Sequence, residues 1–148
     1  MMHTESDLAL LDTGVLIHLV RNDATGQAIE EEHSLAARME RPLLSTVVEA
    51  EVRVFAALQK WGHGKLERLD DLLAELVRVG AGLPEVVEAY IELAPVAQRQ
   101  GQAIATQNQN DLWIAATARA TGAVLYTCDK DFQFLDPDFV RVCYIPPV

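Results

Sequence analysis

Short apolar runs alternate along the chain with longer segments in which apolar residues recur every third or fourth position. Short runs of this kind are typical of buried strands, whereas the longer spacing is typical of helices that bury one face. The short runs predict strands at residues 8–12, 43–46, 76–79, 123–127 and 139–145. The longer segments predict a helix directly after Asp12 and further helices within 25–40, 45–58, 65–76, 84–100 and 111–121.

Strands that alternate with helices predict an α/β fold. Right-handed crossovers between such strands give a central, mainly parallel sheet of about five strands with helices on both faces. The 148 residues suffice for one domain with a hydrophobic core, so we expect a single domain over 1–148. In sheets of this kind, functional sites form beyond the carboxyl ends of the strands.

The helical segments carry specific expectations about their faces and ends. Four apolar residues of segment 25–40 share one face: Ile29, Leu35, Ala36 and Met39. Five leucines form a stripe in the next such segment: Leu66, Leu69, Leu72, Leu73 and Leu76. Pro84 suits a first helical position, whereas Pro95 should kink or break its helix. Segment 111–121 is apolar almost all round, so we expect it to be largely buried.

Asp12 interrupts the apolar stretch LALLDTGVLIHLV at the end of the first predicted strand. A carboxylate between two buried segments is costly in free energy unless it is paired or binds a cation. Asp12 therefore has two interpretations, as a cation ligand and as the cap of the helix that follows.

Segment 45–58 places two glutamates on different helical faces. Glu51 falls within a stripe of apolar residues formed by Val47, Val48, Val54, Phe55 and Leu58. Glu49 lies four residues before Arg53, and a surface ion pair between them explains its presence. Glu51 is therefore the candidate for a functional site, with a helix-edge carboxylate that reaches water as the alternative.

Two further acidic positions adjoin buried elements. Asp111 opens the apolar helix, where either the helix dipole or a metal would explain it, and Asn108 or Asn110 would then be the cap. Asp129 follows directly on the strand at 123–127, and Asp131 comes two residues later. Asp129 is nearer the strand end and is the better candidate. Turn chemistry alone also explains an aspartate there.

Asp12, Glu51, Asp111 and Asp129 can converge at one edge of a single parallel sheet. Clustered carboxylates repel one another and stay partly protonated without a cation. Hard oxygen ligands of this kind select Mg²⁺ or Mn²⁺, which can activate water and neutralise charge on a phosphodiester. Lys130, beside these acids, has two interpretations: a phosphate contact and a solvated lysine.

The composition narrows the function classes. The net charge is −10, and this argues against nonspecific nucleic-acid binding through a basic surface, though not against a nuclease with an acidic cleft. No apolar run is long enough to span a bilayer, and the N-terminus has no signal-peptide pattern, so we expect a cytoplasmic protein without a membrane partner. Cys128 and Cys143 are expected to be buried free thiols.

The same segments resemble PIN-domain ribonucleases, specifically the VapC-type toxins of VapBC toxin–antitoxin pairs. The resemblance rests on LLDTGVLIHL, LSTVVEAEVR, NDLWIAATARATGAVLYTCDKDF and the closing strand VRVCY, in the family's order over nearly the whole chain. It implies a PIN-like domain with an acidic site at Asp12, Glu51, Asp111 and Asp129. Thr13 and Thr127 match its flanking polar positions, with Asp131 as a further supporting acid.

The resemblance implies Mg²⁺- or Mn²⁺-dependent endonucleolytic cleavage of RNA that leaves a 5′-phosphate and a 3′-hydroxyl. It also implies a homodimer and a small cognate antitoxin that occludes the cleft. The RNA target, the number of metal ions and the antitoxin's identity stay open. The amide-rich segment 102–111 is expected to be a polar loop, with base or ribose contacts as the alternative.

The alternatives are an inactive PIN-like binding module and a haloacid-dehalogenase-like phosphatase. The phosphatase chemistry wants a second Asp two positions after the first, where this chain has Gly14. A binding-only module would need no metal, so a metal titration separates it from a nuclease.

Overall fold

The computed structural model describes residues 7–35, 38–102 and 108–148. A five-stranded sheet in the order β3-β2-β1-β4-β5 forms its centre, and all four neighbouring pairs run parallel. The strands are β1 (Ala9–Leu11), β2 (Leu43–Ser45), β3 (Val77–Val79), β4 (Val124–Thr127) and β5 (Val142–Tyr144). Each lies within or overlaps a predicted strand, so the expected parallel α/β fold is confirmed.

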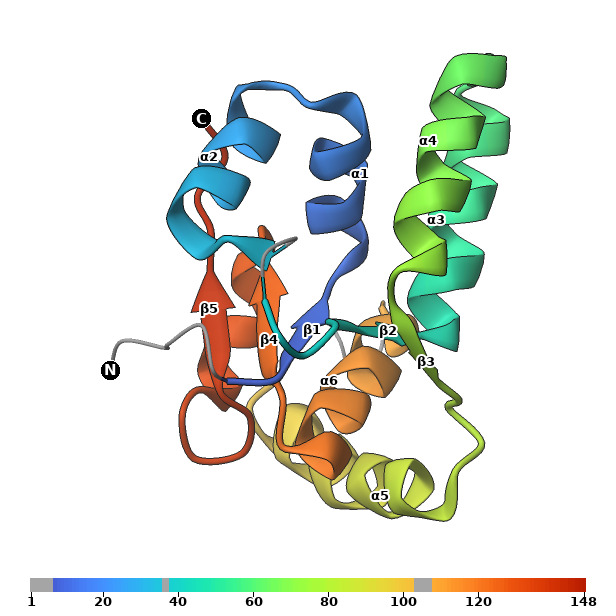
Figure 1. Cartoon of the computed structure of the whole chain (residues 1–148). Helices are drawn as coiled ribbons and strands as arrows, with labels where there is room; N and C mark the ends of the chain where they lie inside the picture. Colours follow the sequence, from blue (N-terminus) through green and yellow to red (C-terminus); the bar gives the residue numbers. More distant parts are fainter. Residues whose placement is uncertain (1–6, 36–37, 103–107) are drawn as a thin grey trace.

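Helices lie on both sides of this sheet (Figure 1). In that view α1 and α2 lie above the strands, α5 and α6 lie below them, and α3 and α4 run along one edge. The helices are α1 (Thr13–Arg21), α2 (Ala24–His33), α3 (Thr46–Leu58), α4 (His63–Ala74), α5 (Pro84–Arg99) and α6 (Gln109–Thr121). A 3₁₀ helix, η3 (Lys130–Leu135), follows β4. Within the described residues, no helix combines the length and apolarity needed to cross a bilayer.

The core lies between the sheet and its helices. Leu10 of β1, Leu44 of β2 and Leu125 of β4 are completely buried in it. Helix α6 contributes Leu112, Ile114, Ala115, Ala116 and Ala118, as expected for a segment that is apolar almost all round. The buried central strands therefore hold their carboxyl ends in fixed positions, and the candidate residues follow those ends.

Helix α2 is shorter than predicted. It ends at His33 because Ser34 adopts a left-handed conformation with φ of 50° and caps the last turn. Met39 was expected on the buried face of this helix, but its side chain is fully exposed, so that prediction was wrong. Ala36, predicted on the same face, lies outside the described residues, whereas Ile29 and Leu35 are buried as expected.

Helix α5 was expected to kink or break at Pro95, yet it continues without interruption from Pro84 to Arg99. The proline cannot donate the bond to the carbonyl one turn earlier, at Ile91. Both Pro95 and Ile91 are exposed, so water can reach that carbonyl. On the opposite face Leu93 and Ala97 are completely buried, and this packing holds the helix together.

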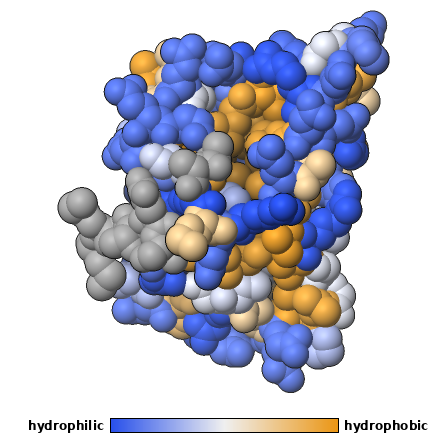
Figure 2. Space-filling model, viewed as in Figure 1, coloured by the Kyte–Doolittle hydropathy of each residue, from blue (hydrophilic) through white to orange (hydrophobic). Residues whose placement is uncertain are grey.

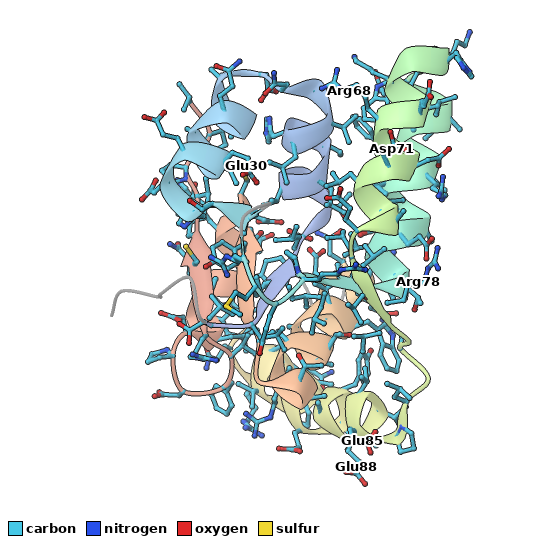
Figure 3. The ribbon with its side chains drawn as sticks, viewed as in Figure 1. Glu30, Arg68, Asp71, Arg78, Glu85 and Glu88 are labelled. Carbon is cyan, nitrogen blue, oxygen red and sulfur yellow. The ribbon has the colours of Figure 1, made fainter. Side chains whose placement is uncertain are left out.

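The two outer helices differ from their predicted apolar stripes. In α4, Leu69 and Leu73 are buried, whereas Leu66, in the first turn of the helix, is exposed. In α3 the core-facing residues are Val48, Val52 and Ala56. Charged side chains of α4 and α5 are exposed (Figure 3). Glu85 and Glu88 of α5 point into solvent, whereas Arg68 and Asp71 of α4 line a hollow shared with α1 and α2.

Candidate active site

Asp12 lies directly beyond the carboxyl end of β1 and is buried. Its Oδ1 accepts a hydrogen bond from the backbone N–H of Thr13 at 2.8 Å, so it caps α1 as one interpretation predicted. Its Oδ2 accepts a second bond, from the hydroxyl of Thr127 at 2.7 Å. The helix cap therefore occupies only one oxygen of the Asp12 carboxylate. The bond from Thr127 of β4 orients the other oxygen toward the neighbouring strand.

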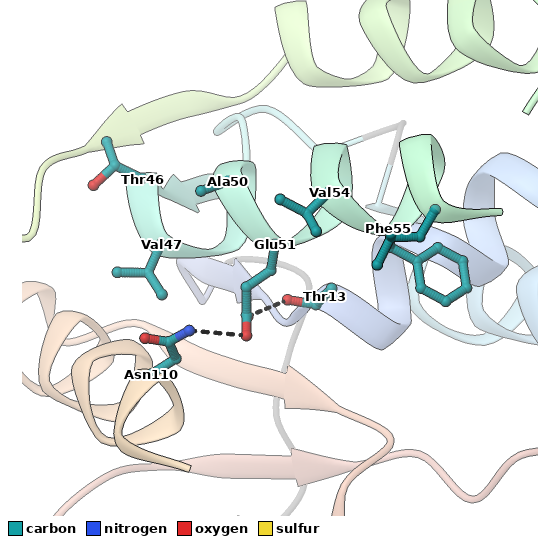
Figure 4. Close-up of a pocket in the computed structure, with 9 residues that line it drawn as sticks. Thr13, Thr46, Val47, Ala50, Glu51, Val54, Phe55 and Asn110 are labelled. Atoms are coloured by element: carbon teal, nitrogen blue, oxygen red, sulfur yellow. Dashed lines mark hydrogen bonds between the residues drawn. The ribbon is translucent and has the colours of Figure 1, made fainter. Parts of the chain in front are cut away.

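Glu51 projects from α3 toward the carboxyl end of β1 (Figure 4). Its Oε1 accepts a hydrogen bond from the hydroxyl of Thr13 at 2.8 Å, and its Oε2 accepts one from the amide of Asn110 at 3.4 Å. The alternative of a carboxylate that merely reaches water from a helix edge does not describe this arrangement, because α1 and α6 both contact it.

The predicted apolar stripe around Glu51 is only partly buried. Val48 is buried, but Val54 is 57% exposed and Leu58 is 74% exposed. The error arises because α3 lies at the edge of the sheet and packs with one side only. Glu51 and these exposed residues line a surface cavity of about 720 Å³, and Val47, Ala50 and Phe55 complete its apolar wall (Figure 4).

Glu49 lies on another face of the same helix. Arg78 of β3 donates two hydrogen bonds to its carboxylate, both of 2.7 Å, while Arg53 is 4.0 Å away. An ion pair therefore explains Glu49 as predicted, but its main partner comes from a distant strand rather than from its own helix.

Asp111 occupies the first turn of α6 and is partly buried. Asn108 stands at the cap position without a side-chain cap bond, and Asn110 instead contacts Glu51. Neither asparagine therefore caps the helix through its side chain. The helix dipole favours a carboxylate at this position, yet the surroundings of Asp111 are acidic.

Asp129 follows β4 and caps η3, where its Oδ1 accepts the N–H of Asp131 at 2.9 Å. Its own N–H donates to the hydroxyl of Thr127 at 3.0 Å. Asp129 lines the same cavity as Asp12, whereas Asp131 is exposed and does not line it. This placement agrees with the expectation that Asp129 is the nearer of the two.

All four predicted acids line one cavity of about 580 Å³ at the carboxyl edge of the sheet. Its lining consists of Asp12, Thr13, Gly14, Glu51, Asp111, Cys128, Asp129, Lys130, Tyr144 and Pro147. The four acids come from four separate elements, which the sequence pattern placed at one edge. Cys128 and Cys143 are free thiols as expected, but both are only half-buried.

Burial and mutual repulsion raise the pKa of two of these acids. Burial raises the pKa of Asp12 to about 6, with further increases from Glu51 and Asp129, while the bonds from Thr127 and Thr13 oppose the change. Burial likewise raises the pKa of Asp111 to about 7, and Asp12, Asp129 and Glu51 add to the effect. A group of acids that resists full ionisation is a typical binding site for a cation.

Sequence reasoning missed the positions of two residues near the acids. Asn110 was considered as a helix cap and as part of the amide-rich segment 102–111, whereas it contacts Glu51 and lines the neighbouring cavity of about 720 Å³. Tyr144 was considered only as part of a closing strand. The position of Tyr144 could have been predicted from the strand register, because Tyr144 pairs with Thr127 at the carboxyl edge of the sheet. Residues 103–107, half of the amide-rich segment 102–111, lie outside the described residues.

The geometry is that of an α/β domain with an acidic cleft, and comparisons identify the family. The sequence matches the profile of the PIN domain family over residues 9–136. Ribonuclease VapC1 of Haemophilus influenzae strain R2866 is 31% identical over 125 residues, covering 84% of this chain and 89% of that protein. The chain therefore belongs to the PIN domain family.

Solved structures agree with this assignment. VapBC2 from Rickettsia felis, bound to a DNA fragment from its promoter, matches with a TM-score of 0.75 at 22% identity, over 93% of this chain and 98% of that chain. VapBC-1 from nontypeable Haemophilus influenzae matches with a TM-score of 0.73 at 25% identity, over 93% and 97% of the two chains. The single-domain parallel fold is thus shared with these toxin–antitoxin complexes.

Proposed function

We propose that this chain is an endoribonuclease that uses a divalent cation, Mg²⁺ or Mn²⁺, and that it is the toxin of a toxin–antitoxin pair. One observation carries the proposal: Asp12, Glu51, Asp111 and Asp129, from four distant segments, line a single cavity. The resemblance to the Haemophilus influenzae ribonuclease supports RNA as the substrate.

The donor set fits a hard cation. All four candidates are carboxylates, the ligands that Mg²⁺ and Mn²⁺ prefer. No three His, Cys, Asp or Glu side chains within the described residues are close enough together to hold one ion directly. Mg²⁺ typically binds through one or two carboxylates and keeps several waters, so this spacing suits it. A bound cation there would activate water and offset the charge of the phosphodiester.

The protein's own residues have separable roles in this proposal. Asp12 and Glu51 are oriented by hydroxyl donors, Thr127 for the first and Thr13 for the second. Each threonine fixes one carboxylate oxygen, and the lone pairs that accept no hydrogen bond can still face a cation. Asp111 has no such donor among the described residues and contributes mainly charge. Asp131 lies outside the cavity and acts only through its field at Asp111.

A protein partner is also part of the proposal. A hollow of about 660 Å³ between α1, α2 and α4 has a mixed lining, in which the apolar residues Leu11, Leu19, Leu72 and Leu76 lie among charged ones such as Arg38, Arg41 and Glu75. Apolar surface of this kind is visible in Figure 2, and Glu30, Arg68 and Asp71 border the adjoining hollow (Figure 3). Apolar hollows with charged rims are typical of protein interfaces. A small antitoxin is the partner that the VapBC structures suggest.

The predicted homodimer remains a proposal. Exposed apolar side chains on α3 and α5 support it, namely Val54, Leu58, Val87 and Ile91. Sedimentation equilibrium at micromolar concentration tests it, because a single species of 16.3 kDa would count against a dimer.

The activity is tested by incubating the purified chain with RNA in EDTA and after addition of Mn²⁺. We expect cleavage only with the metal, with 5′-phosphate and 3′-hydroxyl ends on the products. Asp12→Asn should be inactive under the same conditions while retaining the fold by circular dichroism. A wild-type protein that cleaves no RNA at any metal concentration would instead be a binding module.

A further inference from the structure

Lys130 is the one basic side chain among the ten residues that line the acidic cavity. It is exposed and makes no ion pair with any described residue, although four carboxylates line the same cavity. Several other cations of the chain are engaged: Arg53 with Asp70, Arg78 with Glu49, and Arg119 with Glu92. Lys130 is thus an unpaired cation beside a site that must accept an anion.

The backbone of Lys130 is fixed relative to Asp12. Lys130 is the first residue of η3, whose cap is Asp129, and Phe132 of the same turn is completely buried. The N–H of Asp129 donates to the hydroxyl of Thr127, and that hydroxyl donates to Asp12. Two hydrogen bonds therefore connect this turn to Asp12. The Lys130 side chain is thus attached to the backbone at a fixed position on the edge of the cavity.

Tyr144 is fixed by the same threonine. It pairs with Thr127 in the parallel ladder between β4 and β5, and the N–H of the next residue donates to the Thr127 carbonyl at 2.8 Å. Residues paired in register point to the same face of a sheet. Since the Thr127 side chain points to Asp12, the half-buried ring of Tyr144 lies on the side of the acids, where it lines the cavity.

We propose that Lys130 and Tyr144 form a subsite for one nucleotide of single-stranded RNA next to the cleaved bond. This inference rests on the proposed function. The Lys130 ammonium binds the phosphate that neighbours the cleaved one, and the Tyr144 ring stacks on the attached base. A cation beside an aromatic ring is the usual platform for single-stranded nucleic acid, since every base has a stacking face. A base in a continuous duplex is already stacked and cannot reach such a ring.

A different role for Lys130 makes a different prediction. If its charge only offset the repulsion among the carboxylates, its loss would change the affinity of the cavity for a cation. A phosphate contact leaves cation affinity unchanged and alters substrate binding alone. The two roles are therefore separated by measuring Mn²⁺ binding and RNA kinetics on the same variants.

The first experiment compares Lys130→Gln and Lys130→Arg with the control Lys60→Gln, an exposed lysine outside the cavity. Steady-state RNA cleavage is measured with saturating Mn²⁺ at several salt concentrations. For Lys130→Gln we expect KM to rise by about 5- to 10-fold with kcat unchanged, because contacts made equally in ground and transition states affect KM alone. The slope of log(kcat/KM) against log[salt] should weaken by about 0.7, the value for one phosphate contact on a single strand.

Lys130→Arg should restore both quantities, and Lys60→Gln should match the wild type. The Mn²⁺ dissociation constant, measured by calorimetry without RNA, should be the same for all four proteins. A changed Mn²⁺ affinity in Lys130→Gln, or a KM and salt slope equal to those of Lys60→Gln, would overturn the phosphate contact.

The second experiment tests stacking. Tyr144→Leu keeps an apolar side chain without the aromatic face and should raise KM by roughly 5- to 150-fold, the range measured for base–aromatic stacking. Tyr144→Phe should behave as the wild type. An oligonucleotide with an abasic residue at one position beside the cut should bind the wild type as weakly as intact RNA binds Tyr144→Leu. On that substrate the Tyr144→Leu substitution should have no further effect.

The outcomes separate a failure of the ribonuclease proposal from a failure of the nucleotide subsite. If the wild type cleaves no RNA with Mn²⁺, the proposed function itself fails. If the wild type cleaves RNA but Tyr144→Leu loses equal affinity on intact and abasic substrates, the ribonuclease stands and the subsite is wrong.

Discussion

Acidic side chains in two regions of this protein have opposite electrostatic surroundings. On the outer face of α3, Glu49 is bound by Arg78, and the hydrogen bonds from Arg78 hold the pKa of Glu49 below its usual value. In the cavity, Asp12 and Asp111 have no cationic partner among the described residues, and burial raises the pKa of each. The protein itself supplies a cation that balances Glu49, whereas no described residue forms an ion pair with the acids of the cavity.

The two groups are separated by half a helical turn, because Glu49 and Glu51 lie on the same helix two residues apart. A carboxylate that is paired within the protein contributes to the fold. One that faces other carboxylates opposes folding and is a candidate for function. The following predictions test this division.

The largest expected effect is the difference in RNA cleavage between substitutions of Glu51 and Glu49, the two glutamates of α3. Glu51→Gln removes one charge from the cavity at nearly constant shape, and the rate of RNA cleavage should fall by about 100-fold or more, as when a group that stabilises developing charge is lost. Glu49→Gln should leave the rate within about twofold, since its partner is a surface arginine. Equal losses in both variants would refute the assignment of the two faces.

Cation binding should stabilise the fold through the acids of the cavity and should not depend on Glu49. Mn²⁺ at a hundredfold excess over its dissociation constant should raise the free energy of unfolding of the wild type by about 2.7 kcal/mol. Thermal melts at fixed ionic strength measure the corresponding rise in Tm. Asp111→Asn should lose much of this response, whereas Glu49→Gln should retain all of it. An equal gain in all three proteins would place the metal elsewhere.

The pH dependence of stability without metal should identify the unbalanced acids. Because the folded pKa of Asp111 is about 7 and its usual value is 3.8, the folded chain binds more protons than the unfolded chain between these values. The free energy of unfolding should therefore fall as the pH rises through this window. In EDTA, Asp111→Asn should melt about 2–4 °C above the wild type at pH 8 and at the same temperature near pH 4. A constant difference at both pH values would show that charge is not the cause.

The smallest effect should come from the balanced acid. The lowered pKa of Glu49 means that its stabilising contribution is present above the usual value of 4.5 and is lost as the pH falls through the folded value. Glu49→Gln should lower Tm at pH 7 by no more than about 2 °C. Arg78→Met should have the same effect, and the double variant should add nothing, since both remove one pair. Additive losses would indicate separate partners.

Several parts of this molecule could be predicted from local pattern alone. The strands around Leu10, Leu44 and Leu125 were evident because a short apolar run flanked by polar residues is typical of a buried strand. The separation of Glu51 from Glu49 followed from helical periodicity. These properties depend on residues only a few positions apart, so the order of side chains is sufficient to determine them.

Other properties depended on packing between distant segments. The early end of α2, the exposure of Met39 and the uninterrupted course of α5 through Pro95 were not evident from local pattern. In each case the deciding factor is which face finds a neighbour, and a periodic pattern gives the face but not the neighbour. The same reason explains the exposed Val54 on α3, because a helix at the edge of a sheet has no partner on its outer side.

The acidic site combines both kinds of information. The sequence by itself determined which acids follow the buried strands and which faces of the helices they occupy. Only the tertiary structure decided that Arg78 neutralises Glu49, that Thr127 and Thr13 orient Asp12 and Glu51, and that Tyr144 and Lys130 line the same cavity. Each of these relations joins residues far apart in the chain. Contacts of that kind arise from strand order and register, which form only when the whole sheet assembles.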